Sequence, residues 1–158
     1  WLHDCLPIAK NSTQRSQASQ LSAQQAIRLL IDWQYPKTKL PAIKHAIEAH
    51  SFSANITPTT LEAQVLQDAD RLDSLGAIGI ARTFMVGGKL DGDLYHLTEP
   101  FPHHRAINDK QYVIDHFFQK LLTLHESFQT QAGRQEAIRR TKIMKQFLDD
   151  FHCDITLQ

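Results

Sequence analysis

The chain has 158 residues, and Lys and Arg together number 17, as do Asp and Glu together, so the formal net charge at pH 7 is zero. A chain of this length fits one hydrophobic core, so we expect a single domain spanning residues 1–158. The charge balance argues against polymeric nucleic acid as a partner, because such binding needs an excess of Lys and Arg on one surface.

Several features indicate a cytoplasmic protein with no membrane partner. No apolar run approaches the roughly 20 residues that span a bilayer, and the start lacks the basic and apolar regions of a signal peptide. Cys5 and Cys153 lie near opposite ends, without the spacing of a zinc ribbon or a disulfide scaffold. We expect both to be reduced thiols.

Apolar residues at helical spacing predict two helices in the first third of the chain. The polar stretch at 10–22 indicates a loop or the entry to a helix. A helix is expected from Ser22 to near Pro36, because proline disfavours helix in the residue before it. A second apolar stripe covers 40–47.

The next helix has a recognisable start. Thr59 and Glu62 form a capping-box pattern, and the apolar stripe after them predicts an amphipathic helix that reaches residue 72. Small residues at 76–85 predict a short helix that is ended by Gly87 and Gly88.

The last third is expected to begin with irregular structure at 89–109, which carries glycine and prolines. Asp109 is a candidate N-cap for a helix at 110–128, and a final helix is expected at 137–151. No segment alternates convincingly with period two, so the predicted fold class is all-α. The expected inward-facing residues of these two helices are Val113, Phe117, Leu121, Leu124, Ile138, Ile143, Phe147, Leu148 and Phe151.

His3 and Asp4 form the first candidate metal-binding pair. Neighbouring side chains on a helix diverge by about 100°, so both reach one ion only near a helix end or a kink. A chance His-Asp dipeptide is the alternative.

Asp68 and Asp70 are two residues apart on a helix, so they point to different faces. Asp70 has the apolar neighbours Ala69 and Leu72, which place it near the buried side, where a carboxylate needs a partner such as a divalent cation. Pairing with Arg71 or with a backbone group is the alternative.

His45 and His50 cannot both face one site on a continuous helix, because five residues rotate them by about 140°. We expect one of them to be structural. His50, at a helix end before a polar loop, is the better candidate for a functional residue.

Taken together, these residues resemble the small bacterial HD-domain phosphohydrolases of the YedJ and YpgQ type, which are all-α helical bundles. The pieces that carry the resemblance follow one another in family order along nearly the whole chain. They are His3-Asp4, Lys10-Asn11, His45, His50-Ser51-Phe52-Ser53, Asp68-Ala69-Asp70-Arg71-Leu72, Gly76-Ala77-Ile78-Gly79, His116-Phe117 and Lys120-Leu121-Leu122.

The resemblance implies a divalent metal ion held by His3, Asp4 and Asp70, together with a histidine on an earlier helix. That histidine has no counterpart in the chain, and the start at Trp1 looks like the end of an apolar helix, so we expect an upstream segment and weak metal binding without it. Mixed nitrogen and oxygen ligands favour Mn²⁺, Fe²⁺, Co²⁺ or Ni²⁺, with Mg²⁺ possible. Such an ion polarises a phosphoryl group and activates water.

The implied substrate is a small-molecule phosphate ester or anhydride, with nucleotides as the class that the resemblance suggests. Lys10, His50 and Lys120 are candidates for contacts with phosphate oxygens, although solvent-exposed surface roles are open for both lysines. Asp68 and His50 are candidate catalytic residues, Asp68 as a general base or as an outer-shell partner. A binding module that senses a nucleotide or a metal without catalysis is the alternative function.

The remaining histidines give weaker signals. His116 shares a helical face with Lys120, but a core histidine is a better interpretation than a catalytic one. His103 and His104 lie in a proline-bounded loop and are expected to be surface residues, with Arg105 as a possible lid contact.

Overall fold

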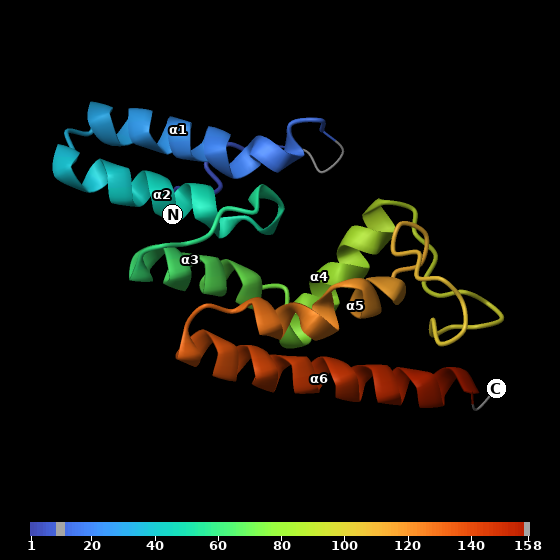
Figure 1. Cartoon of the computed structure of the whole chain (residues 1–158). Coiled ribbons are helices and arrows are strands. Elements are labelled where there is room, and N and C mark those ends of the chain that lie inside the picture. Colours follow the sequence, from blue (N-terminus) through green and yellow to red (C-terminus); the bar gives the residue numbers. More distant parts are fainter. Residues whose placement is uncertain (9–11, 157–158) are drawn as a thin grey trace. The chain divides into compact units, whose positions relative to one another are not determined.

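The computed structural model describes residues 1–8 and 12–156, and helices make up most of its regular structure (Figure 1). Within these residues no β-strand is present, and a single isolated bridge joins Asp93 and Tyr112. The predicted all-α class is therefore confirmed. No helix in the described ranges is both long and apolar enough to cross a membrane.

The chain divides into two compact units, Trp1–Asp70 and Arg71–Gln158. The first unit contains helix α1 (Ala18–Asp32), helix α2 (Leu40–His50) and most of helix α3 (Leu61–Leu72). Short 3-10 turns precede α1 and α2 and follow α2, at Arg15–Gln17, Lys37–Lys39 and Phe52–Ala54.

Helices α1 and α2 lie side by side in the first unit (Figure 1). Their buried contact residues are Ala23 and Ala26 of α1 and Ile47 of α2, with Leu2 and Cys5 packed against them. Alanine has a short side chain, so two helices that meet at alanine approach closely. This contact also holds the N-terminal segment in place.

Two details of the first unit differ from the sequence prediction. Helix α1 begins at Ala18, inside the polar stretch, because Ser19 is buried and its hydroxyl donates to the Glu48 carbonyl at 2.9 Å. The cap of α3 is Thr60 and not Thr59. The Thr60 hydroxyl accepts the Ala63 N–H at 3.2 Å.

The second unit contains helix α4 (Gly76–Lys89), the short helix α5 (Asp115–Gln119), the 3-10 segment η4 (Leu121–Ser127) and helix α6 (Gln131–Thr156). Its core is larger and more aromatic than that of the first unit. The buried members of this core are Leu75, Phe101, Ile114, Phe117, Leu121, Leu124, Phe128, Ala137, Met144 and Leu148.

The predicted helix at 110–128 is wrong in its first turns and in its cap, and after Gln119 it is replaced by the 3-10 segment η4. The amide N–H groups of Val113 and Ile114 donate to the carbonyls of Asp93 and Leu94, so they cannot serve an α-helix. Asp109 does not cap a helix, and its carboxylate lies 3.0 Å from His116 Nδ1. The inward-facing residues predicted for this segment are nevertheless buried: Val113, Phe117, Leu121 and Leu124.

Helix α6 is longer than predicted, and its inward face is rotated. Ile138 and Ile143 were expected inside but are 40% and 37% exposed. Their neighbours Ala137 and Met144 are fully buried instead, and Leu148 is buried as predicted. Phe147 and Phe151 are partly buried against the same core.

Gly87 and Gly88 lie inside α4 and do not end it. The chain leaves the helix at Asp91, which has a left-handed φ of 55°. A Cβ on Gly87 would lie 2.3 Å from Cγ2 of Val113, whereas a Cβ on Gly88 meets nothing within 4 Å. Gly87 therefore allows a close approach that a larger residue would prevent.

This pair of glycines gives a matched test of the packing. We expect Gly87→Ala to lower the free energy of unfolding by about 1–3 kcal/mol, because Val113 is buried and β-branched and cannot move aside freely. Gly88→Ala is expected to raise the free energy of unfolding by about 0.5–1 kcal/mol, since alanine favours the helix. Urea unfolding of both variants measures the difference, and equal effects would contradict this assignment.

Candidate metal centre

The His3-Asp4 doublet lies in a turn near the start of the first unit. Ser22 of α1 holds this turn from both directions. Its carbonyl accepts the Cys5 thiol at 3.4 Å, and its hydroxyl donates to the Leu6 carbonyl at 3.4 Å. Because the doublet is not in a helix, the 100° divergence of helical neighbours does not apply, and the two side chains can converge.

His50 is the last residue of α2, and its side chain is only 5% exposed. Its Nδ1 lies 2.6 Å from the Ile47 carbonyl oxygen. A carbonyl only accepts hydrogen bonds, so Nδ1 carries a proton. The other ring nitrogen, Nε2, faces the carboxylate of Asp4 at 3.4 Å.

Side chains from three helices bind the carbonyl groups at the end of α2. The last four carbonyls of a helix have no partner within the helix itself. Here Ile47 is bound by His50, Glu48 by Ser19 of α1, and Ala49 by Gln67 of α3, whose amide Nε2 donates at 2.7 Å. These bonds fix the position of His50 relative to α1 and α3.

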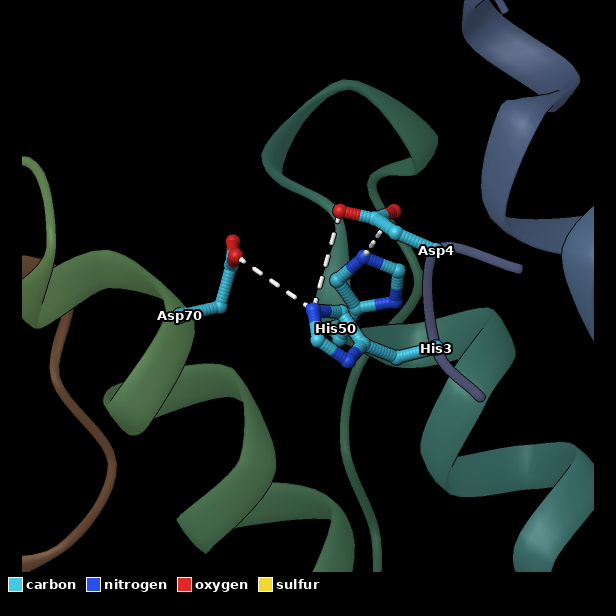
Figure 2. Close-up of side chains that lie close together, drawn as sticks. All are labelled: His3, Asp4, His50 and Asp70. Atoms are coloured by element: carbon cyan, nitrogen blue, oxygen red, sulfur yellow. Dashed lines mark ion pairs between the residues drawn. The ribbon is translucent and has the colours of Figure 1, made fainter. Parts of the chain in front are cut away.

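Asp70 completes the cluster from α3. Its Oδ1 lies 4.0 Å from His3 Nε2, which is also 3.6 Å from Asp4 Oδ2. The donor atoms of His3, Asp4, His50 and Asp70 all lie within 4.8 Å of one another (Figure 2). The side chain of Asp4 is 71% exposed, so the centre has one open side and, at His50, one buried side.

The four side chains fit a divalent transition-metal ion. Two ligands on opposite sides of an ion, each bound at about 2.1 Å, lie about 4.2 Å apart, so small movements would let all four donors bind one ion. His50 already has the arrangement of a metal ligand, because its Nδ1–H is held by a carbonyl and leaves the Nε2 lone pair free. Two imidazoles and two carboxylates suit Mn²⁺, Fe²⁺, Co²⁺ or Ni²⁺.

The structure assembles all three predicted metal ligands and adds a fourth. His3, Asp4 and Asp70 meet as expected. His50 was predicted to contact phosphate or to take part in catalysis, but it lies among these candidate ligands. The described part of the chain thus supplies four donors without an upstream histidine.

One detail of α3 was predicted wrongly. We expected Asp70 to be the acid nearer the buried side, yet its side chain is 39% exposed, whereas Asp68 is 3% exposed. Ala69, whose apolar character suggested the burial of Asp70, is exposed. Asp68 is not a member of the four-residue cluster.

The other candidates lie elsewhere or are engaged in structural contacts. Lys10 falls outside the described residues. Lys120 follows α5 in the second unit. His45 is structural, because its Nε2 accepts the Thr59 amide N–H at 3.0 Å.

Arg105 is also structural and is not a lid contact. Its guanidinium makes two hydrogen bonds of 2.6 Å to the fully buried Asp115. Burial raises the pKa of Asp115, but the hydrogen bonds from Arg105 and from the Asn108 amide more than offset it, and the pKa lies below its ordinary value.

Sequence reasoning missed the polar residues that support the centre. Ser19, Ser22 and Gln67 are each no more than 2% exposed, and each bonds a backbone carbonyl. A signal was present for Gln67, which precedes Asp70 by three residues and so shares its helical face. The two serines belong to the polar stretch at 10–22, for which the sequence left a loop and the entry to a helix open.

Comparison with known proteins places the chain in a family, although no family model matches it. YpgQ of Bacillus subtilis (strain 168) is 32% identical to it, over 98% of this chain and 69% of YpgQ. The structure of an HD-superfamily hydrolase from Bacillus thuringiensis matches with a TM-score of 0.71 and 31% identity, over 99% of this chain and 71% of that one. The chain belongs to the YpgQ-type HD-domain proteins.

The crystal structure of Bacillus subtilis YpgQ in complex with ADP matches this YpgQ-type chain with a TM-score of 0.72 and 31% identity, over 97% of this chain and 69% of that one. The predicted family is therefore confirmed, and with it the HD-type helical fold. The likeness to the Bacillus thuringiensis protein also supports membership in a hydrolase family.

Proposed function

We propose that this YpgQ-type protein is a metal-dependent phosphohydrolase that cleaves phosphate ester or anhydride bonds of nucleotides, and that residues 1–158 belong to one HD domain. The observation that carries the proposal is the cluster of His3, Asp4, His50 and Asp70, which combines two imidazoles and two carboxylates at an open site. The hydrolase family of the relatives supports the reaction type, and the ADP complex of YpgQ supports a nucleotide substrate.

Each residue of the cluster has a defined task in this proposal. His3 and His50 provide neutral Nε2 donors, and the Ile47 carbonyl keeps His50 in the required tautomer. Asp4 and Asp70 supply the negative charge that balances a divalent cation. The bound ion supplies polarisation of the phosphoryl group and acidification of a water molecule.

The exposure of the two carboxylates gives the site its open side. Asp4 and Asp70 are 71% and 39% exposed at their side chains, so water and a phosphate group can approach there. Lys10 and Lys120 remain our candidates for phosphate contacts, and Asp68 for the general base or an outer-shell partner. For His50 we propose the role of a metal ligand, because its Nε2 faces Asp4 and its ring is buried.

A non-catalytic sensor of a nucleotide or a metal is the second candidate function, because a complex with ADP, as crystallised for YpgQ, is also what a nucleotide sensor would form. The test removes metal from the purified protein with a chelator and then adds Mn²⁺, Co²⁺, Ni²⁺, Mg²⁺ or no ion. Phosphate release is measured from nucleoside mono-, di- and triphosphates and from inorganic pyrophosphate. We expect release only with a divalent ion. ADP binding without release from any compound would favour the sensor.

A further inference from the structure

Two buried polar atoms close to the cluster lack a hydrogen-bond partner among the described residues. They are Nδ1 of His3 and Oε1 of Gln67. A buried polar atom left without a hydrogen bond costs about 1–3 kcal/mol. Unpartnered atoms of this kind in a native structure call for a functional or structural reason.

The two atoms are chemically complementary if His3 binds a metal ion. Ligation through Nε2 leaves the imidazole proton on Nδ1, which then needs an acceptor. Histidine ligands in proteins almost always donate this proton to a carboxylate, a backbone carbonyl or a water molecule. His50 follows that pattern through Ile47, whereas His3 has no such partner among the described residues.

Gln67 offers the missing acceptor. The Ala49 carbonyl only accepts, so the amide nitrogen of Gln67 faces it at 2.7 Å, and this fixes Oε1 as a free acceptor. Gln67 is bonded to the residue before His50, and the ring of His50 lies 4.9 Å from that of His3. The donor, on His3, and the acceptor, on Gln67, thus belong to side chains that both contact the end of α2 at His50 and the residue before it.

We propose that Gln67 is a positioning residue of the metal centre, an inference that rests on the proposed metal-dependent function. Its Nε2 holds the end of α2 that carries His50. Its Oε1 accepts the Nδ1 proton of His3 through one bound water, because neither atom has a direct partner among the described residues. One side chain of α3 therefore orients both imidazoles, and Asp70 follows it by one turn on the same helix.

The test uses the protein loaded with Co²⁺, whose paramagnetism shifts the proton resonances of bound imidazoles. We expect two shifted N–H resonances that exchange slowly with water, one from His3 and one from His50. Gln67→Met has a similar shape but no amide, so it should lose the slow exchange of one resonance and bind Co²⁺ about 10–100-fold more weakly. The Ile47 carbonyl should protect the other resonance.

Gln64→Met is the matched control, because Gln64 is half-buried on the same helix one turn earlier. It should keep both resonances and the Co²⁺ affinity. Gln67→Glu retains an oxygen acceptor and should also keep both resonances. This variant tests whether Gln67 supplies the acceptor for His3 if Gln67→Met does not fold.

The possible failures are distinct. Two protected resonances and an unchanged Co²⁺ affinity in Gln67→Met would contradict the role of Gln67 but not the metal site. Loss of a resonance in Gln67→Glu would likewise contradict that role. If the unmodified protein does not bind Co²⁺, the proposed metal site itself is contradicted, and with it the proposed function.

Discussion

Asp70→Ala is expected to abolish metal-dependent phosphate release and to weaken metal binding by more than about 100-fold. Outer-shell substitutions at metal sites cost about 10–100-fold, and Asp70 is a candidate ligand itself. Its loss also removes one of the two carboxylates that balance the charge of the ion. Isothermal titration with Mn²⁺ and the phosphate-release assay measure the two effects separately.

Glu62→Ala is the control for Asp70→Ala. Glu62 is an exposed acid in the first turn of the same helix and is not a member of the cluster. It should leave both Mn²⁺ affinity and turnover unchanged. Full activity in Asp70→Ala would refute the assignment of Asp70 as a ligand.

The largest expected effect on stability comes from Asp115→Ala, which should lower the free energy of unfolding by about 3 kcal/mol. The Asp115 carboxylate is fully buried and accepts two hydrogen bonds from the Arg105 guanidinium, whose side chain is 13% exposed and whose other hydrogen bonds go to backbone carbonyls. Removing the acid leaves a mostly buried cation without the negative charge that balances it. Urea unfolding at pH 7 measures the loss.

The same variant gives a test of pH dependence. The pKa of Asp115 is lowered in the folded protein, so its ionisation contributes stability above the unfolded-state pKa of about 3.9. That contribution is lost as the pH falls through the lowered folded-state value. The difference in free energy of unfolding between the unmodified protein and Asp115→Ala should therefore become smaller only below about pH 3.9.

Asp109→Ala serves as the comparison for Asp115→Ala. Asp109 also lies beside a basic side chain, with its carboxylate 3.0 Å from His116 Nδ1, but both side chains are about one-third exposed, at 34% and 35%. Such a pair contributes less than about 1 kcal/mol. An equal loss in the two variants would show that burial does not determine the strength of the Arg105 pair.

Apolar periodicity predicted the presence of α2 and α3 better than it predicted which of their residues are buried. The bounds of α2 and α3 lie close to the predicted ones, because their apolar residues recur with the period of a helix, although Leu61 and Val65 of the α3 stripe are exposed. The segment at 110–128 has the same periodicity, yet two of its amides bond to Asp93 and Leu94. That choice depends on a contact some 20 residues away, which local spacing does not record.

Three members of the candidate site, His3, Asp4 and Asp70, were predicted as metal ligands from the sequence, whereas the place of His50 among them was not. The resemblance identified His3, Asp4 and Asp70 by their order along the chain. The position of His50 depends on where α2 ends and on the hydrogen bonds that Ser19 and Gln67 make to the end of that helix. These two bonds are tertiary contacts, which the sequence does not display. A five-residue spacing from His45 left the role of His50 open.

The contrast between the exposed Asp4 and the buried His50 has a consequence for the rate at which the centre exchanges its ion. A cation approaching from solvent meets the carboxylate first, at a side chain that is 71% exposed, and reaches the 5% exposed imidazole last. Attraction by exposed charges is screened by salt, whereas detachment from a buried donor is not. We therefore expect added salt to slow the uptake of metal while leaving its release nearly unchanged.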